Sequence, residues 1–68
     1  SDEVKISFSE NGNHHIKIYN EFGAEIFDST ISTINYELST INFKKGIYFV
    51  CFLNEKTGMM TTKKLVLQ

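Results

Sequence analysis

The fold of this chain depends on the stretch Gly46-Ile47-Tyr48-Phe49-Val50-Cys51-Phe52-Leu53. Successive side chains of a β-strand point to opposite sides of the sheet, so this run presents apolar groups on both faces. Such a pattern is typical of a central strand that is covered on each side, or of one with a partner on its outer face. We therefore expect residues 46–53 to form the central strand of a sheet.

The residues that follow predict a C-terminal hairpin. Residues 54–58, Asn-Glu-Lys-Thr-Gly, have the composition of a Gly-containing hairpin loop. Residues 59–68 are expected to form the last strand, with Leu65 and Leu67 on one face and Lys64, Val66 and Gln68 on the other. This hairpin, residues 46–68, is the part of the chain in which we expect its functional identity to reside.

Alternation with a period of two also marks strands upstream of the hairpin. Val4, Ile6 and Phe8 alternate with polar residues and predict a half-buried strand. Two further strands are expected at residues 16–19 and 24–28, each preceded by turn residues, Asn11-Gly12-Asn13 and Asn20-Glu21-Phe22-Gly23. We expect these three strands to form a meander.

The middle of the chain is less regular. Residues 29–33 are polar and β-branched, which favours a loop or a weak edge strand, and residues 34–38 alternate again and predict a fourth strand. Residues 39–45 are expected to be an irregular link whose apolar members, Ile41 and Phe43, pack into the core.

Length and strand spacing together predict an all-β fold, a small antiparallel immunoglobulin-like β-sandwich of about six to seven short strands. The 68 residues allow a single domain, residues 1–68. An immunoglobulin-like sandwich normally takes about 100 residues, so we expect a shortened form or one that lacks its first strand.

Charge and composition exclude several classes of function. Seven lysines, no arginine and a net charge of −1 argue against nucleic-acid binding, because arginine supplies the bidentate contacts to phosphates and base edges. Cys51 is the only cysteine, so no internal disulfide can form, and we expect it to be a small core residue. The chain shows no secretory signal peptide of its own, and export would need a signal elsewhere in a longer precursor.

No catalytic or metal-binding constellation is evident, and we expect neither an enzyme nor a cofactor. His14 and His15 are adjacent and should point to opposite faces of a strand, so they are expected to face solvent rather than to share a metal. The carboxylates are scattered singly, and no Gly-x-Ser-x-Gly motif is present.

Four aromatic residues leave two interpretations open: Tyr19, Tyr36, Tyr48 and Phe49. They could form a platform for sugars, or they could pack in the core, as aromatic residues do in small β domains. The absence of tryptophan favours core packing.

Three segments, taken in order, resemble one family. Residues 16–26, Ile-Lys-Ile-Tyr-Asn-Glu-Phe-Gly-Ala-Glu-Ile, resemble its strand followed by x-x-Gly-x-x-Val; Leu38-Ser39 through Phe43-Lys44-Lys45-Gly46-Ile47-Tyr48-Phe49-Val50 resembles its Leu-Ser, short link and Lys-Gly-hydrophobic-Tyr segment. The ending Thr62-Lys63-Lys64-Leu65-Val66-Leu67-Gln68 resembles its terminal Thr-Lys-Lys-aliphatic strand. The family is the type A C-terminal sorting domain of the type IX (Por) secretion system of Bacteroidota.

The matched positions have roles that can be argued physically. Gly23 and Gly46 fit places where the backbone needs a positive φ or a close approach. Tyr48 can bury its ring while its hydroxyl reaches a loop carbonyl. The matched residues of the last strand are Lys63, Lys64, Leu65 and Val66. The lysine pair either protects an edge strand from uncontrolled pairing or is recognised, with the strand, by a receptor.

The resemblance implies a function. It implies a non-catalytic targeting signal, covalently part of a larger cargo protein, recognised by the outer-membrane type IX translocon and removed by a sortase-like peptidase. The cargo would be in the periplasm in transit and then on the cell surface or secreted.

The family usually opens with Pro-Asn-Pro and a first strand, which this sequence lacks, so we expect the chain to start inside the domain and to have an exposed edge able to support a dimer. The alternative is an immunoglobulin- or fibronectin-like adhesion or carbohydrate-binding module of a larger surface protein.

Overall fold

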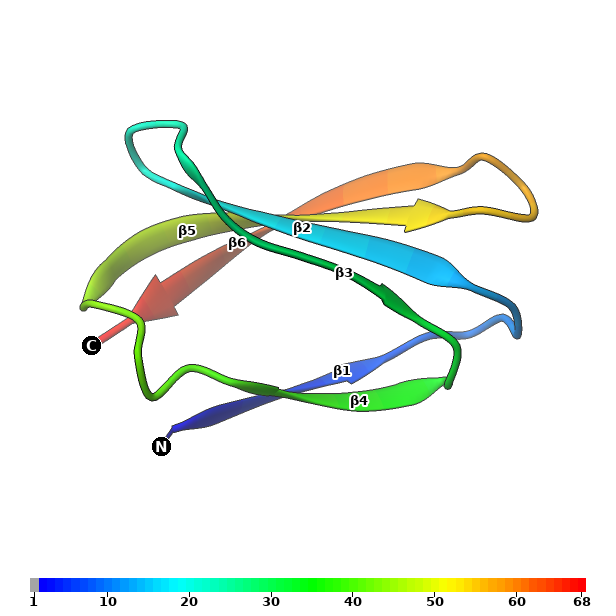
Figure 1. Ribbon diagram of the computed structural model, residues 1–68, viewed down its shortest axis with the longest axis horizontal. Coiled ribbons are helices and arrows are strands. Elements are labelled where there is room, and N and C mark those ends of the chain that lie inside the picture. Colours follow the sequence, from blue (N-terminus) through cyan, green and yellow to red (C-terminus); the bar gives the residue numbers. More distant parts are fainter. Residues whose placement is uncertain (1) are drawn as a thin grey trace.

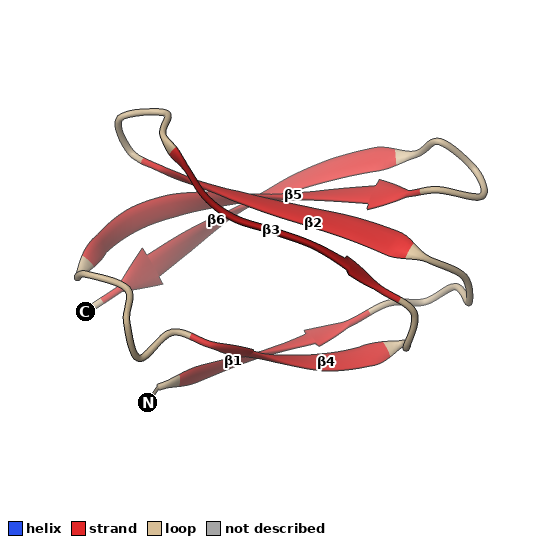
Figure 2. Ribbon diagram, in the orientation of Figure 1, coloured by secondary structure: helices blue, strands red, loops and turns tan. Residues whose placement is uncertain are grey.

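A computed structural model describes residues 2–68, and within them it contains β-strands and no helix (Figure 2). The six strands are β1 Glu3–Ser7, β2 His14–Asn20, β3 Glu25–Ile31, β4 Asn35–Ser39, β5 Gly46–Asn54 and β6 Met60–Leu67. Since helices are absent from the described part, it holds no helix of the length and hydrophobicity that a membrane crossing requires.

The strands form two antiparallel sheets that face one another, as Figure 1 shows. The larger sheet has the order β3-β2-β5-β6, and the smaller sheet pairs β1 with β4. This confirms the predicted all-β sandwich and places β5 in the interior of its sheet, between β2 and β6, as its apolar sequence predicted. Sandwiching buries the inner faces of both sheets, where the core lies.

The predicted meander of the first three strands is wrong. β2 and β3 do form a hairpin, but β1 pairs with β4 in the other sheet. The physical reason is that both edges of β2 are occupied, one by β3 and the other by β5. The chain after β1 therefore crosses between the sheets, and the Phe8 amide donates a hydrogen bond of 2.8 Å to the carbonyl of Ile34.

The middle of the chain is more regular than its sequence indicated. β3 continues through residues 29–31, so the predicted loop or weak edge strand is in part the end of an edge strand. Of the two apolar residues in the link before β5, Phe43 packs against the core. Ile41 was expected there too, but it is 66% exposed, since it lies in a turn that the smaller sheet does not cover.

The buried apolar core is small. Its members come from β2, β3, β4 and β5: Ile16, Ile18, Ile31, Leu38, Tyr48 and Val50. Half-buried residues of β1 and β6 pack around them, among them Val4, Ile6, Leu65 and Leu67. A chain of this length buries a modest share of its surface, so each of these residues carries much of the stability.

Two side chains lie on the opposite side from the one expected. His14 was expected to face solvent, but it is buried and its ring stacks on Phe8 at a centroid distance of 3.8 Å. Cys51 was expected in the core, but it is half-buried on the outer face of β5, with Sγ 3.6 Å from the Thr62 hydroxyl. His15 does point away from His14, as the alternation predicted.

Candidate recognition site

The C-terminal hairpin, β5 and β6, holds most of the residues singled out from the sequence. Its register pairs Gly46 with Leu67, Tyr48 with Leu65, and Lys64 with Phe49. Tyr48 and Leu65 face the core together, whereas Val66 faces outward beside Ile47. The alternation of the two strands thus divides the predicted residues between an inner, structural set and an outer, accessible set.

Tyr48 plays the part that the sequence predicted. Its ring is buried and lies 5.5 Å from that of Phe43, while its hydroxyl donates a hydrogen bond of 2.5 Å to the carbonyl of Lys44. The side chain therefore fastens the irregular link before β5 to the start of the hairpin.

The two glycines of the motif have left-handed backbones. Gly23, in the β2–β3 turn, has φ of 87°, and Gly46, at the start of β5, has φ of 148°, which L-residues adopt only with strain. In the β2–β3 turn, Asn20 Oδ1 accepts hydrogen bonds from the amides of Phe22 and Ala24. The Glu21 carboxylate of this turn lies 3.8 Å from the place of a Cβ on Gly46, so both glycines belong to the same end of the sandwich.

Lys63 and Lys64 are both exposed, but they lie on opposite faces of β6. Lys63 pairs with the buried, inward-facing Val50, and Lys64 pairs with Phe49 on the outer face. β6 is an edge strand, as expected for lysines that discourage further pairing.

Asn54 was missed by the sequence reasoning, although it organises the β5–β6 loop. It is 6% exposed, and its Oδ1 accepts hydrogen bonds from the amides of Lys56 and Thr57 at 2.9 and 3.2 Å. Its Nδ2 lies 3.3 Å from Glu10 and 3.4 Å from His14 Nε2. The signal was available, since an asparagine that precedes a turn commonly bonds to the backbone two residues on.

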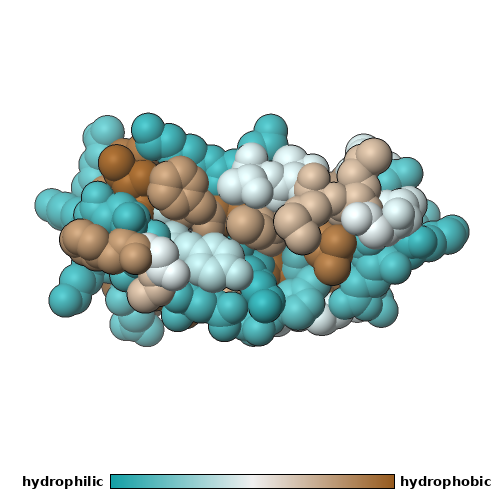
Figure 3. Space-filling view, turned by 90° about the horizontal axis from the view of Figure 1, so that it is seen from above, coloured by the Kyte–Doolittle hydropathy of each residue, from teal (hydrophilic) through white to brown (hydrophobic). Residues whose placement is uncertain are grey.

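The outer face of the larger sheet carries a contiguous set of apolar side chains, which we call the outer apolar stripe. It consists of Tyr19, Ile47, Phe49, Cys51, Leu53, Met60 and Val66, neighbours across β2, β5 and β6. Figure 3 views this face and shows an apolar band along it between hydrophilic borders. Lys17, Tyr19, Leu53 and Met60 line a shallow, mainly apolar hollow in the stripe.

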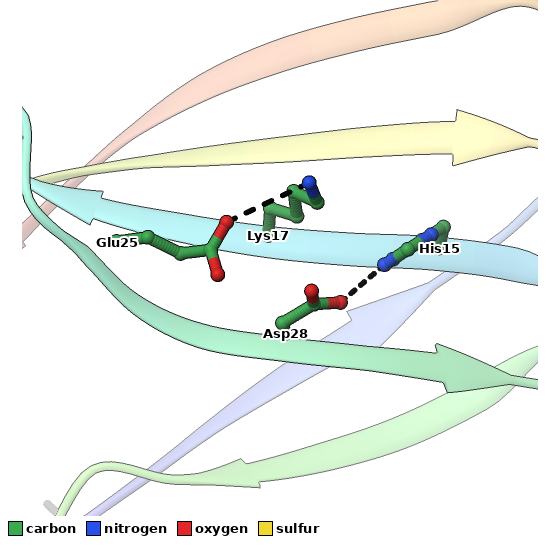
Figure 4. A network of polar contacts seen from close by, with 4 residues as sticks. All are labelled: His15, Lys17, Glu25 and Asp28. Atoms are coloured by element: carbon green, nitrogen blue, oxygen red, sulfur yellow. Dashed lines mark hydrogen bonds and ion pairs between the residues drawn. The ribbon is translucent and has the colours of Figure 1, made fainter.

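One border of the stripe is formed by two polar contacts between β2 and β3, a Lys–Glu ion pair and a His–Asp contact, both drawn in Figure 4. Lys17 Nζ lies 3.6 Å from Glu25 Oε1, and His15 Nε2 contacts Asp28 Oδ1. On the other border, Lys64 makes no ion pair with any residue in the range 2–68. Both carboxylates on the strands of this face therefore have a basic partner, whereas Lys64 has no acidic one.

The four aromatic residues considered as a sugar platform are not gathered in one place. Tyr48 is buried and Tyr36 packs against the core, whereas Tyr19 and Phe49 are partners on the outer face. Among residues 2–68, no three His, Cys, Asp or Glu side chains are placed to hold a metal ion. The aromatic residues thus divide between core and stripe, and core packing accounts for two of them.

Comparison with known families decides what kind of domain this is. A family model described as "Secretion system C-terminal sorting domain" matches residues 1–68. The chain belongs to this family. No curated protein and no solved structure matches it.

Membership gives the sorting domain its general role. The family comprises signals for type IX secretion, which export proteins to the cell surface or release them, and it is a family of targeting domains rather than of enzymes. The resemblance drawn from the Gly23, Gly46–Tyr48 and Lys63–Lys64 motifs is confirmed at the level of the family.

Proposed function

We propose that this sorting domain is of type A and directs a cargo protein through the type IX translocon of the outer membrane. The observation that carries the proposal is the match of the whole chain to the sorting-domain family. The three motifs quoted from the sequence, which include Gly23, Gly46, Tyr48, Lys63 and Lys64, support the subtype.

The domain acts by being bound, not by catalysis. The cargo crosses the inner membrane with a signal peptide of its own, passes through the periplasm, and presents the sorting domain to the translocon. A sortase-like peptidase then removes the domain as the cargo is anchored at the surface. The scattered carboxylates and the divided aromatic residues are consistent with a domain that has no chemistry of its own.

The C-terminal hairpin is the element that we propose the translocon recognises. β6 lies at the edge of its sheet and exposes Lys63, Lys64 and Val66. Recognition could use the free edge of β6, by addition of a strand, or the outer face of the sheet, by shape complementarity. The free edge could also support a dimer of isolated domains.

A periplasmic reporter fused to this domain, in a host with the type IX system, tests the proposal. We expect the reporter to reach the cell surface with the intact domain and to stay in the periplasm when residues 64–68 are deleted. Because Leu65 and Leu67 pack against the core, the double variant Lys63→Ala/Lys64→Ala, which leaves that packing intact, is measured beside the deletion. Unchanged export of the deletion would contradict the proposal, as would a reporter with the intact domain that never leaves the periplasm.

A further inference from the structure

We propose that the translocon component binds the outer apolar stripe of the larger sheet, and that it places a carboxylate opposite Lys64. This inference rests on the proposed function, because it names the surface through which the sorting domain is recognised. It selects the sheet face rather than the free edge of β6.

Apolar side chains of the stripe are exposed to solvent. A strand that is apolar on both faces is normally covered on both, yet the smaller sheet covers only the inner face of β5. On the outer face, Phe49, Val66 and Met60 are 39%, 50% and 65% exposed. Contiguous apolar surface bordered by polar residues is typical of a protein-interaction site.

The area of the stripe's face sets the size of the interface. The sandwich measures 32 × 23 × 15 Å, and the outer face of the larger sheet, seen in Figure 3, spans its longest and shortest dimensions, 32 and 15 Å. A specific interface of standard size buries about 800 Å² on each partner, so a face of about 500 Å² fits a smaller interface, of the kind that transient complexes use. The stripe runs along the middle of this face, where the residues that dominate affinity usually lie.

The charged groups on this face select the kind of partner. Glu25 and Asp28 are already paired with Lys17 and His15, whereas Lys64 has no ionic partner in the described chain. The strands of this face in a second copy would bring only Glu25 and Asp28, carboxylates that already have partners. The stripe therefore fits a different protein, with an apolar patch and a free Asp or Glu beside it.

The edge of β6 is less suited to recognition by strand addition. Its exposed lysine side chains, Lys63 on one face and Lys64 on the other, are of the kind that discourages pairing with another strand. The sheet face offers apolar contact, which gives affinity, and the unpaired charge of Lys64, which fixes the orientation of the partner.

Exposed residues of the same type, one at the stripe and one away from it, supply matched pairs for the test. Lys44, in the link before β5, and Lys64 are both exposed, and Met59 and Met60 are 68% and 65% exposed, with only Met60 in the stripe. Met59 instead lines a hollow with Phe8 and Phe52 at the open side of the sandwich. Each pair holds residue type and exposure nearly constant while the location changes.

The experiment compares Lys64→Glu with Lys44→Glu and Met60→Ser with Met59→Ser in the fused reporter. We expect Lys64→Glu and Met60→Ser each to lower the surface-to-periplasm ratio about tenfold, the loss that follows removal of one important interface contact. The controls should export normally, and thermal unfolding of all four isolated domains should show that they remain folded.

The outcomes separate this inference from the proposed function. If the stripe variants export like their controls while deletion of residues 64–68 blocks export, the stripe is not the binding surface and the proposed function stands. Equal losses in both members of each pair would overturn the choice of face. A concentration-dependent dimer that Met60→Ser dissolves, measured by analytical ultracentrifugation, would show that the stripe binds a second copy instead.

Discussion

At the residue scale, the hydroxyl of Tyr48 ties the link before β5 to the hairpin by a hydrogen bond. It donates to the carbonyl of Lys44, and the ring is buried. Tyr48→Phe keeps the ring and deletes this hydrogen bond, so we expect a loss of about 1 kcal/mol in the free energy of unfolding, measured by urea denaturation. Tyr36→Phe is the control, because Tyr36 is only half-buried and lies in the other sheet. Equal losses in the two variants would contradict the role given to the Tyr48 hydroxyl.

Glu3 provides a prediction about pH at the same scale. A side-chain hydrogen bond with Glu37, and then repulsion by the same carboxylate, raise the pKa of Glu3 above its ordinary value of 4.5. The folded state therefore holds this proton more tightly than the unfolded state does. The contribution to stability is present below the ordinary pKa and is lost as the pH rises through the raised pKa of the folded state.

The variant Glu3→Gln, which cannot lose a proton, should therefore gain stability relative to the parent as the pH rises from about 4 to about 7. Thermal unfolding at the two pH values measures this difference. Glu55→Gln, in the exposed β5–β6 loop, controls for the general loss of a negative charge. A difference between Glu3→Gln and the parent that is the same at both pH values would refute the assignment.

At the scale of the element, the β5–β6 loop depends on Asn54. Asn54→Ala removes the acceptor for the amides of Lys56 and Thr57 and leaves Glu10 without its contact from Nδ2. Since the side chain is buried, we expect a loss of about 1–3 kcal/mol in the free energy of unfolding, measured by urea denaturation. Asn20→Ala removes a similar pair of bonds in the β2–β3 turn, but Asn20 is more exposed and the loss should be smaller. The reverse order would show that the loop is not organised by Asn54.

The elements also show what local sequence can predict. Alternation and turn residues were sufficient for β5, β6 and the β2–β3 hairpin, because each depends on residues close in sequence. Alternation and turn residues could not predict the partner of β1. This strand pairs with β4, about 30 residues away, and alternation does not say which sheet a strand joins. The side of the sheet that His14 and Cys51 face could have been predicted from alternation. His14 lies two residues before the buried Ile16 and points to the same side, whereas Cys51 directly follows the buried Val50 and points to the opposite side.

The candidate site divides in the same way. The burial of Tyr48, its bond to a loop carbonyl and the positive φ of Gly23 and Gly46 followed from side-chain chemistry and the geometry of glycine. The outer apolar stripe did not, because it requires the register of β2, β5 and β6 to bring Tyr19, Phe49 and Lys64 into one row. A surface assembled from three strands is a property of the pairing and not of any one of them.

At the scale of the whole molecule, the core is so small that one substitution in it is enough to unfold much of the domain. A domain of 68 residues has a free energy of unfolding of roughly 3–10 kcal/mol at 0.05–0.15 kcal/mol per residue. Ile16 is fully buried in β2, the strand that joins β3 to β5. Replacing a buried Ile by Ala costs about 2–5 kcal/mol, which is a large share of that total. We therefore expect Ile16→Ala to unfold much of the isolated domain, as measured by circular dichroism.

This variant tests whether the signal resides in the folded surface or in the linear sequence. Ile16 lies outside the C-terminal hairpin, and Ile16→Ala leaves every residue of β6 and of the outer apolar stripe in place. If the translocon binds the stripe, export of the reporter should fall in proportion to the fraction of domain unfolded, because the stripe exists only while β2, β5 and β6 are paired. Ile41→Ala, at a residue that is 66% exposed, should change neither stability nor export. Normal export of an unfolded Ile16→Ala domain would mean that the residues of β6 are recognised as an extended peptide, and recognition by a sheet face would be excluded.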